Sequence, residues 1–290
     1  MELGSLGIMI AFAAAIILGK ILGVKVPDIV FRSVVIALVF TISLWAAESG
    51  VSILFKSLVT TIAILGLLVF SLVTLGYLFD SNSSQTLKSK PKARPSYSLL
   101  AAIIAGWTVG FLYPLVPQTF LQNVVLLEVY LVIAVTGLAV SGDIHFESIK
   151  TGGRIALKAV LLSILSALIT GLGSSLLLGL PPDVALQIMF GLGWYSFAGP
   201  FVAQAYGPMW GFTAFLVNVL REQLTFVLVP LLRKPFLSMI SLGGATTMDN
   251  TLPVYSYVYG EDASIVSLIH GFILTLLVPF LQGTIRALIL

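Results

Sequence analysis

Ten long apolar segments make up most of this chain, and they constrain its fold more than any other feature. Inside a bilayer only helices and closed barrels satisfy every backbone polar group, and barrel strands alternate apolar with polar residues. These runs are continuous, so the sequence predicts an all-α polytopic membrane protein with one transmembrane domain over residues 1–290. The segments are Leu3–Gly19, Ile29–Ala47, Ser57–Phe79, Ser98–Val116, Phe120–Val140, Ile155–Leu180, Val184–Ala205, Met209–Leu232, Phe236–Tyr259 and Ala263–Ile285.

The composition agrees with this class and excludes several others. Hydrophobic residues make up 58% of the chain and charged residues 9%, unlike a soluble domain. The absence of cysteine excludes disulfides and thiolate sites, and two histidines (His145 and His270) are too few for a histidine-rich metal site. The net charge of +3 lies mostly in short loops, where it sets orientation, so we expect lipid and not nucleic acid as the surroundings.

Basic residues in the loops predict the orientation of the chain in the cell membrane. The basic loop Asp80–Ser96 should be cytoplasmic, and so should the loops that follow the first and fifth segments. The linkers Tyr113–Thr119 and Gly179–Asp183 carry no basic residue and should face outward, which places the N-terminus outside. The basic residues concerned are Lys88, Lys90, Lys92 and Arg94, then Lys20, Lys25 and Arg32, and finally Lys150, Arg154 and Lys158.

The last third of the chain leaves two topologies open. Arg233–Lys234 should be cytoplasmic, which requires Val184–Ala205 to enter from outside and return, and Phe236–Tyr259 to be re-entrant or broken as well. We therefore expect about eight full transmembrane helices and two re-entrant or broken segments, with both termini outside. The alternative is ten segments arranged as two inverted five-helix repeats, which also places both termini outside.

Two of the apolar segments are interrupted. Gly191–Pro200, GLGWYSFAGP, cannot hold a regular helix, and it brings the polar tips of Trp194, Tyr195 and Ser196 to the break. Leu242–Pro253, LGGATTMDNTLP, supplies oxygen atoms from five side chains, those of Thr246, Thr247, Asp249, Asn250 and Thr251. The alternative interpretation of the first segment is an interfacial aromatic belt, and that of the second is a plain loop between two helices. A pair of interrupted segments indicates the binding site of a transporter.

Charged residues in the middle of a spanning segment are costly and usually functional. Arg221 and Glu222 stand in the uncharged run Met209–Leu232, and Asn218 shares a helix face with Glu222. The alternative is a structural ion pair that only fixes packing. Glu48 ends the second segment and is either an exposed carboxylate or an acid in a cavity. We expect Glu128 to reach the interface and His270 to be a packing residue.

Four motifs in order resemble the bacterial and archaeal lysine exporter family LysO, also known as YbjE. They are GLGWYSFAGP, NVLRE (Asn218–Glu222), GGATTMDNTLPV and IHGFILTLLVPFL, and the resemblance is specific across roughly Ile188–Leu281. It implies a polytopic transporter with both termini outside that exports L-lysine and its toxic analogue thialysine. It also implies two membrane-embedded acids, one at Glu222 and the other at Glu48, where the family usually has Asp.

A mechanism follows as a hypothesis. Glu222 and Glu48 suit the ammonium groups of lysine, and Arg221 or a half-helix N-terminus near Gly193–Ser196 or Gly243–Thr246 suits its carboxylate. Protons entering from outside would release lysine by neutralising an acid, which is lysine/proton antiport without a cofactor. One alternative is a transporter of another small cationic or amino-acid solute. Another is sodium coupling, with oxygen ligands from Asp249, Thr246, Thr247 and Asn250. The sequence shows no catalytic motif of an intramembrane enzyme. It contains no motif that specifies an oligomeric state.

Overall fold

Every regular element in the structure is helical within the residues described. The computed structural model describes residues 5–23, 26–48, 50–79, 97–112, 116–141 and 146–289, so the basic loop Asp80–Ser96 and His145 lie outside the described residues. All ten apolar segments are confirmed as helical, eight as single helices and two as broken ones. The elements are α1 Ser5–Leu22, α2 Asp28–Glu48, α3 Val51–Phe79, α4 Tyr97–Leu112, α5 Gln118–Val140, α6 Phe146–Leu178, α7 Pro182–Met189, α8 Tyr195–Tyr206, α9 Pro208–Leu232, α10 Phe236–Gly243, the 3-10 helix η1 Gly244–Met248, α11 Leu252–Tyr259 and α12 Glu261–Ile289.

The helices have the length and the surface of a multi-pass membrane protein. Six of those described (α2, α3, α5, α6, α9 and α12) are long and apolar enough to cross a membrane. Large apolar side chains such as Phe70 on α3 and Leu176 on α6 are exposed, while Thr61 and Ser163 on the same helices are fully buried. This reverses the distribution of a soluble protein and is the one expected where lipid is the solvent.

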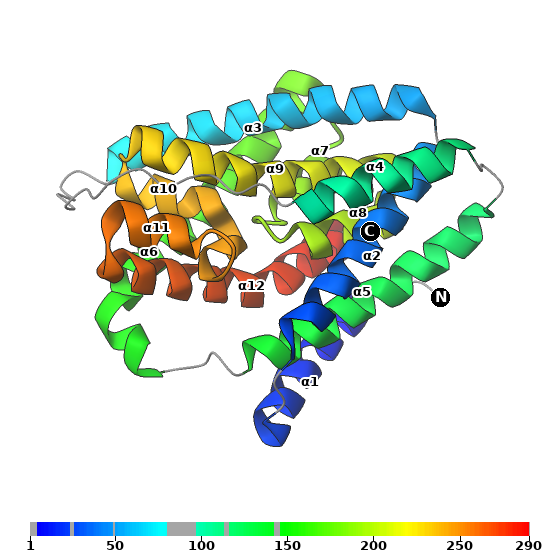
Figure 1. Ribbon diagram of the computed structural model, residues 1–290. Helices are drawn as coiled ribbons and strands as arrows, with labels where there is room; N and C mark the ends of the chain where they lie inside the picture. The colour runs from blue at the N-terminus through cyan, green and yellow to red at the C-terminus, as the bar shows by residue number, and fades with distance from the viewer. Residues whose placement is uncertain are drawn as a thin grey trace.

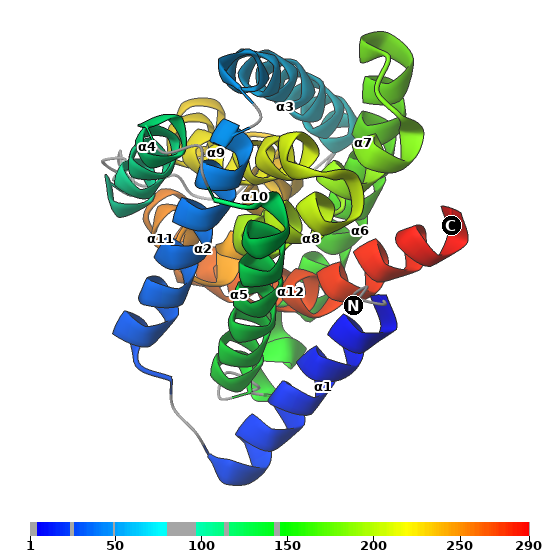
Figure 2. The same ribbon diagram turned by 90° about the vertical axis from the view of Figure 1, so that its right-hand side faces the viewer.

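The helices form two groups that meet beside α8 and α9. In one group, α2 packs against α4 and α5, and α5 packs against α1. In the other, α9 packs against α3 and α8, while α12 packs against α6, α11 and η1. Figure 1 shows α3 and α9 running in nearly the same direction, with α1, α2 and α5 slanting across them. In Figure 2, α2 and α4 lie on the opposite side of the molecule from α7.

A cluster of buried residues joins the two groups. Val39 and Ala46 of α2 lie in one apolar cluster with Tyr195 of α8 and Phe215 of α9. Tyr195 meets Phe215 edge to face, with their ring centroids 5.9 Å apart. The start of α8, which follows the first break in the chain, is therefore held between the two groups.

The close contact of α8 and α9 depends on a glycine. A Cβ added to Gly211 would lie 2.6 Å from the Cα and 2.8 Å from the backbone nitrogen of Ala203, whereas one added to Gly173 meets nothing within 4 Å. We expect Gly211→Ala to destabilise the protein by about 1–3 kcal/mol through overpacking. The matched control Gly173→Ala should unfold at the wild-type temperature or slightly above it. Melting temperatures in detergent would test this, and equal values for both variants would contradict it.

Candidate functional site

Asn218 of α9 supports the first break, between α7 and α8. The chain turns there through Leu192 and Gly193, whose φ angles are 46° and 93°. The Asn218 carboxamide accepts a hydrogen bond from the Gly193 N–H (2.7 Å). It also donates to the carbonyls of Ile188 (3.1 Å) and Ala214 (2.8 Å). The Asn218 side chain thus provides hydrogen-bond partners for backbone N–H and C=O groups that the break leaves unpaired in the membrane interior.

Arg221, one turn further along α9, supports the second break in the same way. The helix α10 ends at Gly243, so its last carbonyls lack partners within the helix. Arg221 donates from Nε to the Leu242 carbonyl (2.8 Å) and from Nη2 to the Ser241 carbonyl (2.6 Å). The residue is only 1% exposed, and its Nη1 is buried without a hydrogen-bond partner. A guanidinium suits this position because its fork of donors reaches two carbonyls at once.

The tips of the two interrupted segments touch each other. The Ala245 N–H donates to the Leu192 carbonyl (2.8 Å), which joins η1 to the first break. A Cβ on Gly244 would fall on the Leu192 carbonyl oxygen, and one on Gly193 would lie 2.9 Å from the Gly243 oxygen. Glycine is required at both positions by this close approach and by their positive φ angles, 93° for Gly193 and 62° for Gly244.

Each interrupted segment brings its two ends close together. In the second segment, the Tyr259 hydroxyl donates to the Arg233 carbonyl (2.8 Å), and the Tyr259 ring meets Phe236 with centroids 5.0 Å apart. The Tyr255 hydroxyl also donates to the Met239 carbonyl (2.8 Å), so α11 runs back along α10. In the first segment, Tyr206 at the end of α8 hydrogen-bonds to Asp183 at the start of α7.

Glu222 lies beside the two tips with a polar set of its own. The Asn250 side chain donates to Oε2 of Glu222 (3.2 Å), and the Tyr195 hydroxyl hydrogen-bonds to the same asparagine. Asp249 lies near enough to act electrostatically on both Glu222 and Tyr195. Glu222 is 3% exposed, whereas Asp249 and Asn250 are exposed. The arrangement is a buried carboxylate next to an accessible one, which can attract an ammonium group.

Arg221 and Glu222 are neighbours in sequence but have different partners. Arg221 bonds to carbonyls at the end of α10, while Glu222 bonds to Asn250 and to Gln223. No salt bridge joins the two side chains. The structural ion pair that the sequence left open is therefore not the arrangement found here.

The other predicted site residues lie at varying distances from Glu222. Trp194 turns away from it into the apolar core, where its ring packs on Phe12 and Phe197. Ser196 is buried at the start of α8. The hydroxyls of Thr246 and Thr247 donate to the carbonyls of Gly243 and Gly244 (2.9 Å each), so both threonines stabilise the tip.

Glu48 is the last residue of α2, and its side chain lies outside the described residues. Its neighbours Ala46 and Ala47 belong to the buried cluster that includes Phe212 of the first turns of α9. The role expected of Glu48 therefore stays a prediction.

Two buried polar contacts were not predicted from the sequence. His270 of α12 is fully buried between Ser163 of α6 and Thr247, with both ring nitrogens 2.9 Å from a hydroxyl oxygen. Gln187 of α7 and Gln282 of α12 each donate a side-chain amide to the other's backbone carbonyl (2.9 and 2.6 Å). Polar side chains inside apolar helices were the signal in the sequence, but their partners lie on other helices, between 23 and 107 residues away. Packing was expected of His270, and it holds the tip as well.

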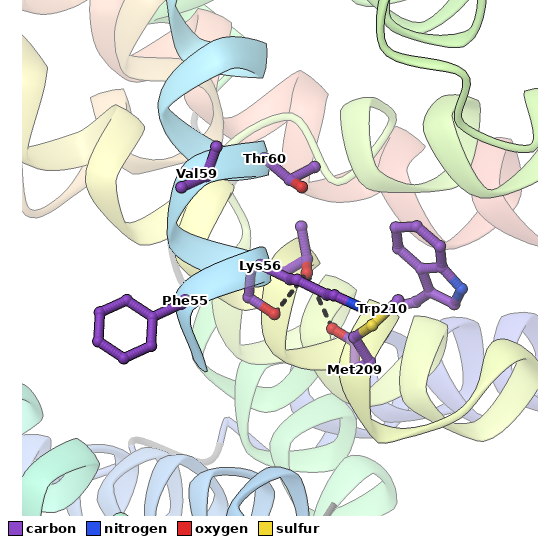
Figure 3. Close-up of a pocket in the computed structure, with 8 residues that line it drawn as sticks. Phe55, Lys56, Val59, Thr60, Met209 and Trp210 are labelled. Atoms are coloured by element: carbon purple, nitrogen blue, oxygen red, sulfur yellow. Dashed lines mark hydrogen bonds between the residues drawn. The ribbon is translucent and has the colours of Figure 1, made fainter. Parts of the chain in front are cut away.

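A groove of about 380 Å³ opens between the first turns of α3 and α9 (Figure 3). Lys56 of α3 reaches across it toward Met209 and Trp210, while Phe55 points away (Figure 3). Its lining is mostly apolar apart from Lys56 and a few hydroxyls. A lysine side chain repels a cationic ligand, so this groove is a poor candidate for the binding of a basic amino acid. In the described ranges no three histidine or acidic side chains gather as a metal site would require.

The fold and the site define a multi-pass helical membrane protein whose buried acid adjoins two interrupted segments, an arrangement typical of secondary transporters. The family described as "Lysine exporter LysO" matches residues 100–285, and the chain belongs to that family. The sequence is 34% identical over 194 residues to the "Lysine exporter LysO" of Escherichia coli K12, covering 65% of this chain and 63% of the relative. It is 36% identical over 118 residues to a "Putative lysine exporter" of Haemophilus influenzae, covering 40% and 60%.

The chain thus spans less than two thirds of the length of either relative. No solved structure gives a significant match. The resemblance seen in four sequence motifs is confirmed, and it assigns the chain to a family of transport proteins and not of enzymes.

The contacts of Arg221 lead to a stability prediction. We expect Arg221→Met to destabilise the protein by about 1–3 kcal/mol or more, because it removes the guanidinium hydrogen bonds to two buried carbonyls. The matched control is Arg233→Met, since Arg233 is partly exposed and donates from Nε to a single carbonyl, that of Pro230 (3.0 Å). Thermal unfolding in detergent should show a large fall in melting temperature for the first variant only. Similar small shifts for both would mean that Arg221 does not support α10.

Proposed function

We propose that this protein is a secondary active exporter of L-lysine, and also of thialysine, that exchanges the amino acid for protons. The observation that carries the proposal is the buried Glu222 beside Asp249, at the meeting point of two interrupted segments. Membership of a family whose relatives are named lysine exporters supports the substrate. Lysine carries one net positive charge at neutral pH, and two carboxylates near each other suit that charge.

We propose a topology of eight full crossings and two re-entrant hairpins, with both termini outside the cell membrane. The hairpins are α7–α8 and α10–α11, and the hydrogen bonds of Tyr259 with Arg233 and of Tyr206 with Asp183 support a return of each segment to the side it entered. With Arg233–Lys234 in the cytoplasm, this topology also obeys the positive-inside rule.

In this proposal the ammonium groups of lysine bind to Glu222 and Asp249, with Tyr195 and Asn250 as polar neighbours. The α-carboxylate binds to the unpartnered Nη1 of Arg221 or to the first turn of α8, where helix N–H groups point at the ligand. Asn218, Thr246 and Thr247 hold the tips in place and act on the substrate only through them. Trp194 and Ser196 fix the start of α8 in the same indirect way.

Alternating access then requires the tips to separate on one side at a time. A proton arriving from outside neutralises a membrane-embedded carboxylate and favours the release of lysine, and the protonated carrier then returns. Sodium is the alternative coupling ion, and transport of another small cationic or amino-acid solute is the alternative activity. Vesicles that contain the purified protein distinguish these cases, since each gradient and each solute can be imposed separately.

The first test is counterflow of labelled lysine in vesicles with and without a pH gradient. We expect Glu222→Gln to lower the rate at least ~30-fold, because loss of a buried charge partner costs about 2 kcal/mol or more. The protein should still insert in the membrane and elute as the wild type does, since glutamine preserves the size of the side chain. Counterflow at the wild-type rate by this variant would rule out Glu222 as the substrate acid.

The second acid is identified by comparing Asp249→Asn with Glu48→Gln. Asp249 is near Glu222 in space, while Glu48 was expected from the sequence. We expect Asp249→Asn to raise the lysine concentration needed for half-maximal counterflow by about 10-fold or more. If Glu48→Gln abolishes export and Asp249→Asn does not, the second ammonium site lies at the end of α2.

The topology is tested by labelling single cysteines, because the chain has none of its own. We expect Lys234→Cys to react with a membrane-impermeant maleimide only after the cytoplasmic side is exposed. Ten full crossings predict reaction from outside instead. Both topologies place Pro181→Cys outside and Asp262→Cys inside, so these two exposed positions serve as controls.

A further inference from the structure

Glu128 is a second membrane-embedded acid that the substrate site does not use. It is the eleventh of the 23 residues of α5, so it lies half-way along a helix long enough to span the membrane. The sequence interpretation, in which Glu128 reaches the interface, does not fit this central position. The side chain is turned toward α2, where the Thr41 hydroxyl lies 3.0 Å from its Oε1. Its Oε2 is buried and has no hydrogen-bond partner.

The hydrogen-bond geometry fits a protonated Glu128. The Thr41 hydroxyl lies 3.0 Å from Oε1 of Glu128 and also 3.0 Å from the carbonyl of Ala37, but it has a single proton to donate. If Glu128 carries a proton on Oε1, it donates to Thr41, and Thr41 donates to Ala37. Both hydrogen bonds then form at once, and the buried Oε2 is an uncharged carbonyl oxygen.

No cation compensates an ionised Glu128 among the described side chains. The elements packed on α5 are α1, α2 and α8. Lys20 of α1 is exposed in the last turn of that helix. Arg32 of α2 is also exposed, and it lies nine residues before Thr41, about 13 Å along the helix. The other titratable groups are uncharged phenols, Tyr130 on α5 itself and Tyr195 and Tyr206 on α8. The side chains of Asp28 and Glu48 on α2 are not described.

Helix α2 connects this acid to the proposed substrate site. Thr41 of α2 contacts Glu128, while Val39 and Ala46 of the same helix pack in the cluster that contains Tyr195 and Phe215. Tyr195 in turn bonds to Asn250, the partner of Glu222. Any movement of α8 or α9 during transport therefore alters the packing of the helix that carries Thr41.

We propose that Glu128 binds the proton that this protein exchanges for lysine, at a site separate from the substrate acid Glu222. The inference rests on the proposed antiport and adds the location of the coupling ion. A proton from outside binds to Oε1 of Glu128 and makes it neutral, which lets both hydrogen bonds of Thr41 form in the conformation seen here. In a second conformation the carboxyl loses its contact with Thr41, meets water on the cytoplasmic side and releases the proton there.

The experiment separates exchange from net transport in vesicles that contain the full chain. Exchange of labelled for unlabelled lysine without a pH gradient needs only the substrate site and its movement. Accumulation driven by a pH gradient, with proton flux followed by an internal pH dye, also needs the coupling site. We expect Glu128→Gln to keep exchange within about 2-fold and to lose gradient-driven accumulation by at least ~10-fold, while Glu222→Gln loses both.

Two further variants keep the test decisive if Glu128→Gln is poorly folded. Glu128→Asp retains a carboxyl group and should recover part of the gradient-driven accumulation. Thr41→Val removes the hydroxyl and should shift the pH dependence of accumulation while exchange persists. Its matched control is Thr108→Val on α4, an exposed hydroxyl that bonds only to the Ile104 carbonyl, and this change should leave both assays unaltered.

The proposal is overturned if folded Glu128→Gln still couples lysine to proton flux, or if it loses exchange as completely as Glu222→Gln. Accumulation driven by sodium and not by protons in the wild type would overturn it as well. Absence of lysine exchange by the wild-type protein is a different failure. It would overturn the proposed lysine export itself, and the assignment of Glu128 with it.

Discussion

The structure depends on how two interruptions of the chain are satisfied in the dry interior of a membrane. Each break frees backbone N–H and C=O groups, and hydrocarbon offers them no partner. Helix α9 supplies the partners for both breaks. Asn218 bonds to the first break and Arg221, one turn later, to the second. Glu222 follows directly and is left to face Asn250 and Asp249.

Because Arg221 and Glu222 bond to different partners, the two adjacent charges do not form an ion pair with each other. A buried guanidinium is usually matched by a carboxylate, and removing either partner of such a pair is costly. Here the positive charge meets carbonyl oxygens at the C-terminal end of α10, where the helix dipole is negative. The carboxylate of Glu222 is therefore not neutralised by Arg221, so the proposed cation site can lie next to a permanently charged arginine.

Much of the fold could be predicted from the sequence, because length and continuity of apolar runs fix helices in a bilayer. The two breaks were predicted too, since Gly191, Gly193 and the pair Gly243–Gly244 cannot continue a regular helix. What could not be predicted is which side chain meets which break. The partner of Arg221 depends on the crossing of α9 and α10, and no local pattern encodes that crossing.

The same limit applies to the acids. Glu222 was identified from its position in an apolar run, and its exposed neighbour Asp249 was seen only as a source of oxygen atoms. Glu128 was expected at the interface because it lies about two turns into its segment, whereas it is the eleventh of the 23 residues of α5 and faces α2. Distances along a helix are readable from sequence, but the direction in which a side chain points depends on neighbouring helices.

The hydrogen bond between Ala245 and Leu192 bears on how the proposed transporter avoids opening to both sides of the membrane at once. A transporter that opens to both sides at once becomes a pore and dissipates the gradient that drives it. Withdrawing either tip breaks the same bond and leaves one donor and one acceptor unpaired, at a cost of about 1–3 kcal/mol for a buried group. Water that enters when the first tip withdraws can pair with these two groups. Withdrawal of the second tip must also break the close contacts of Gly193 and Gly244. In the proposed transporter, each tip therefore keeps the other in place, and withdrawal of both tips at once is disfavoured.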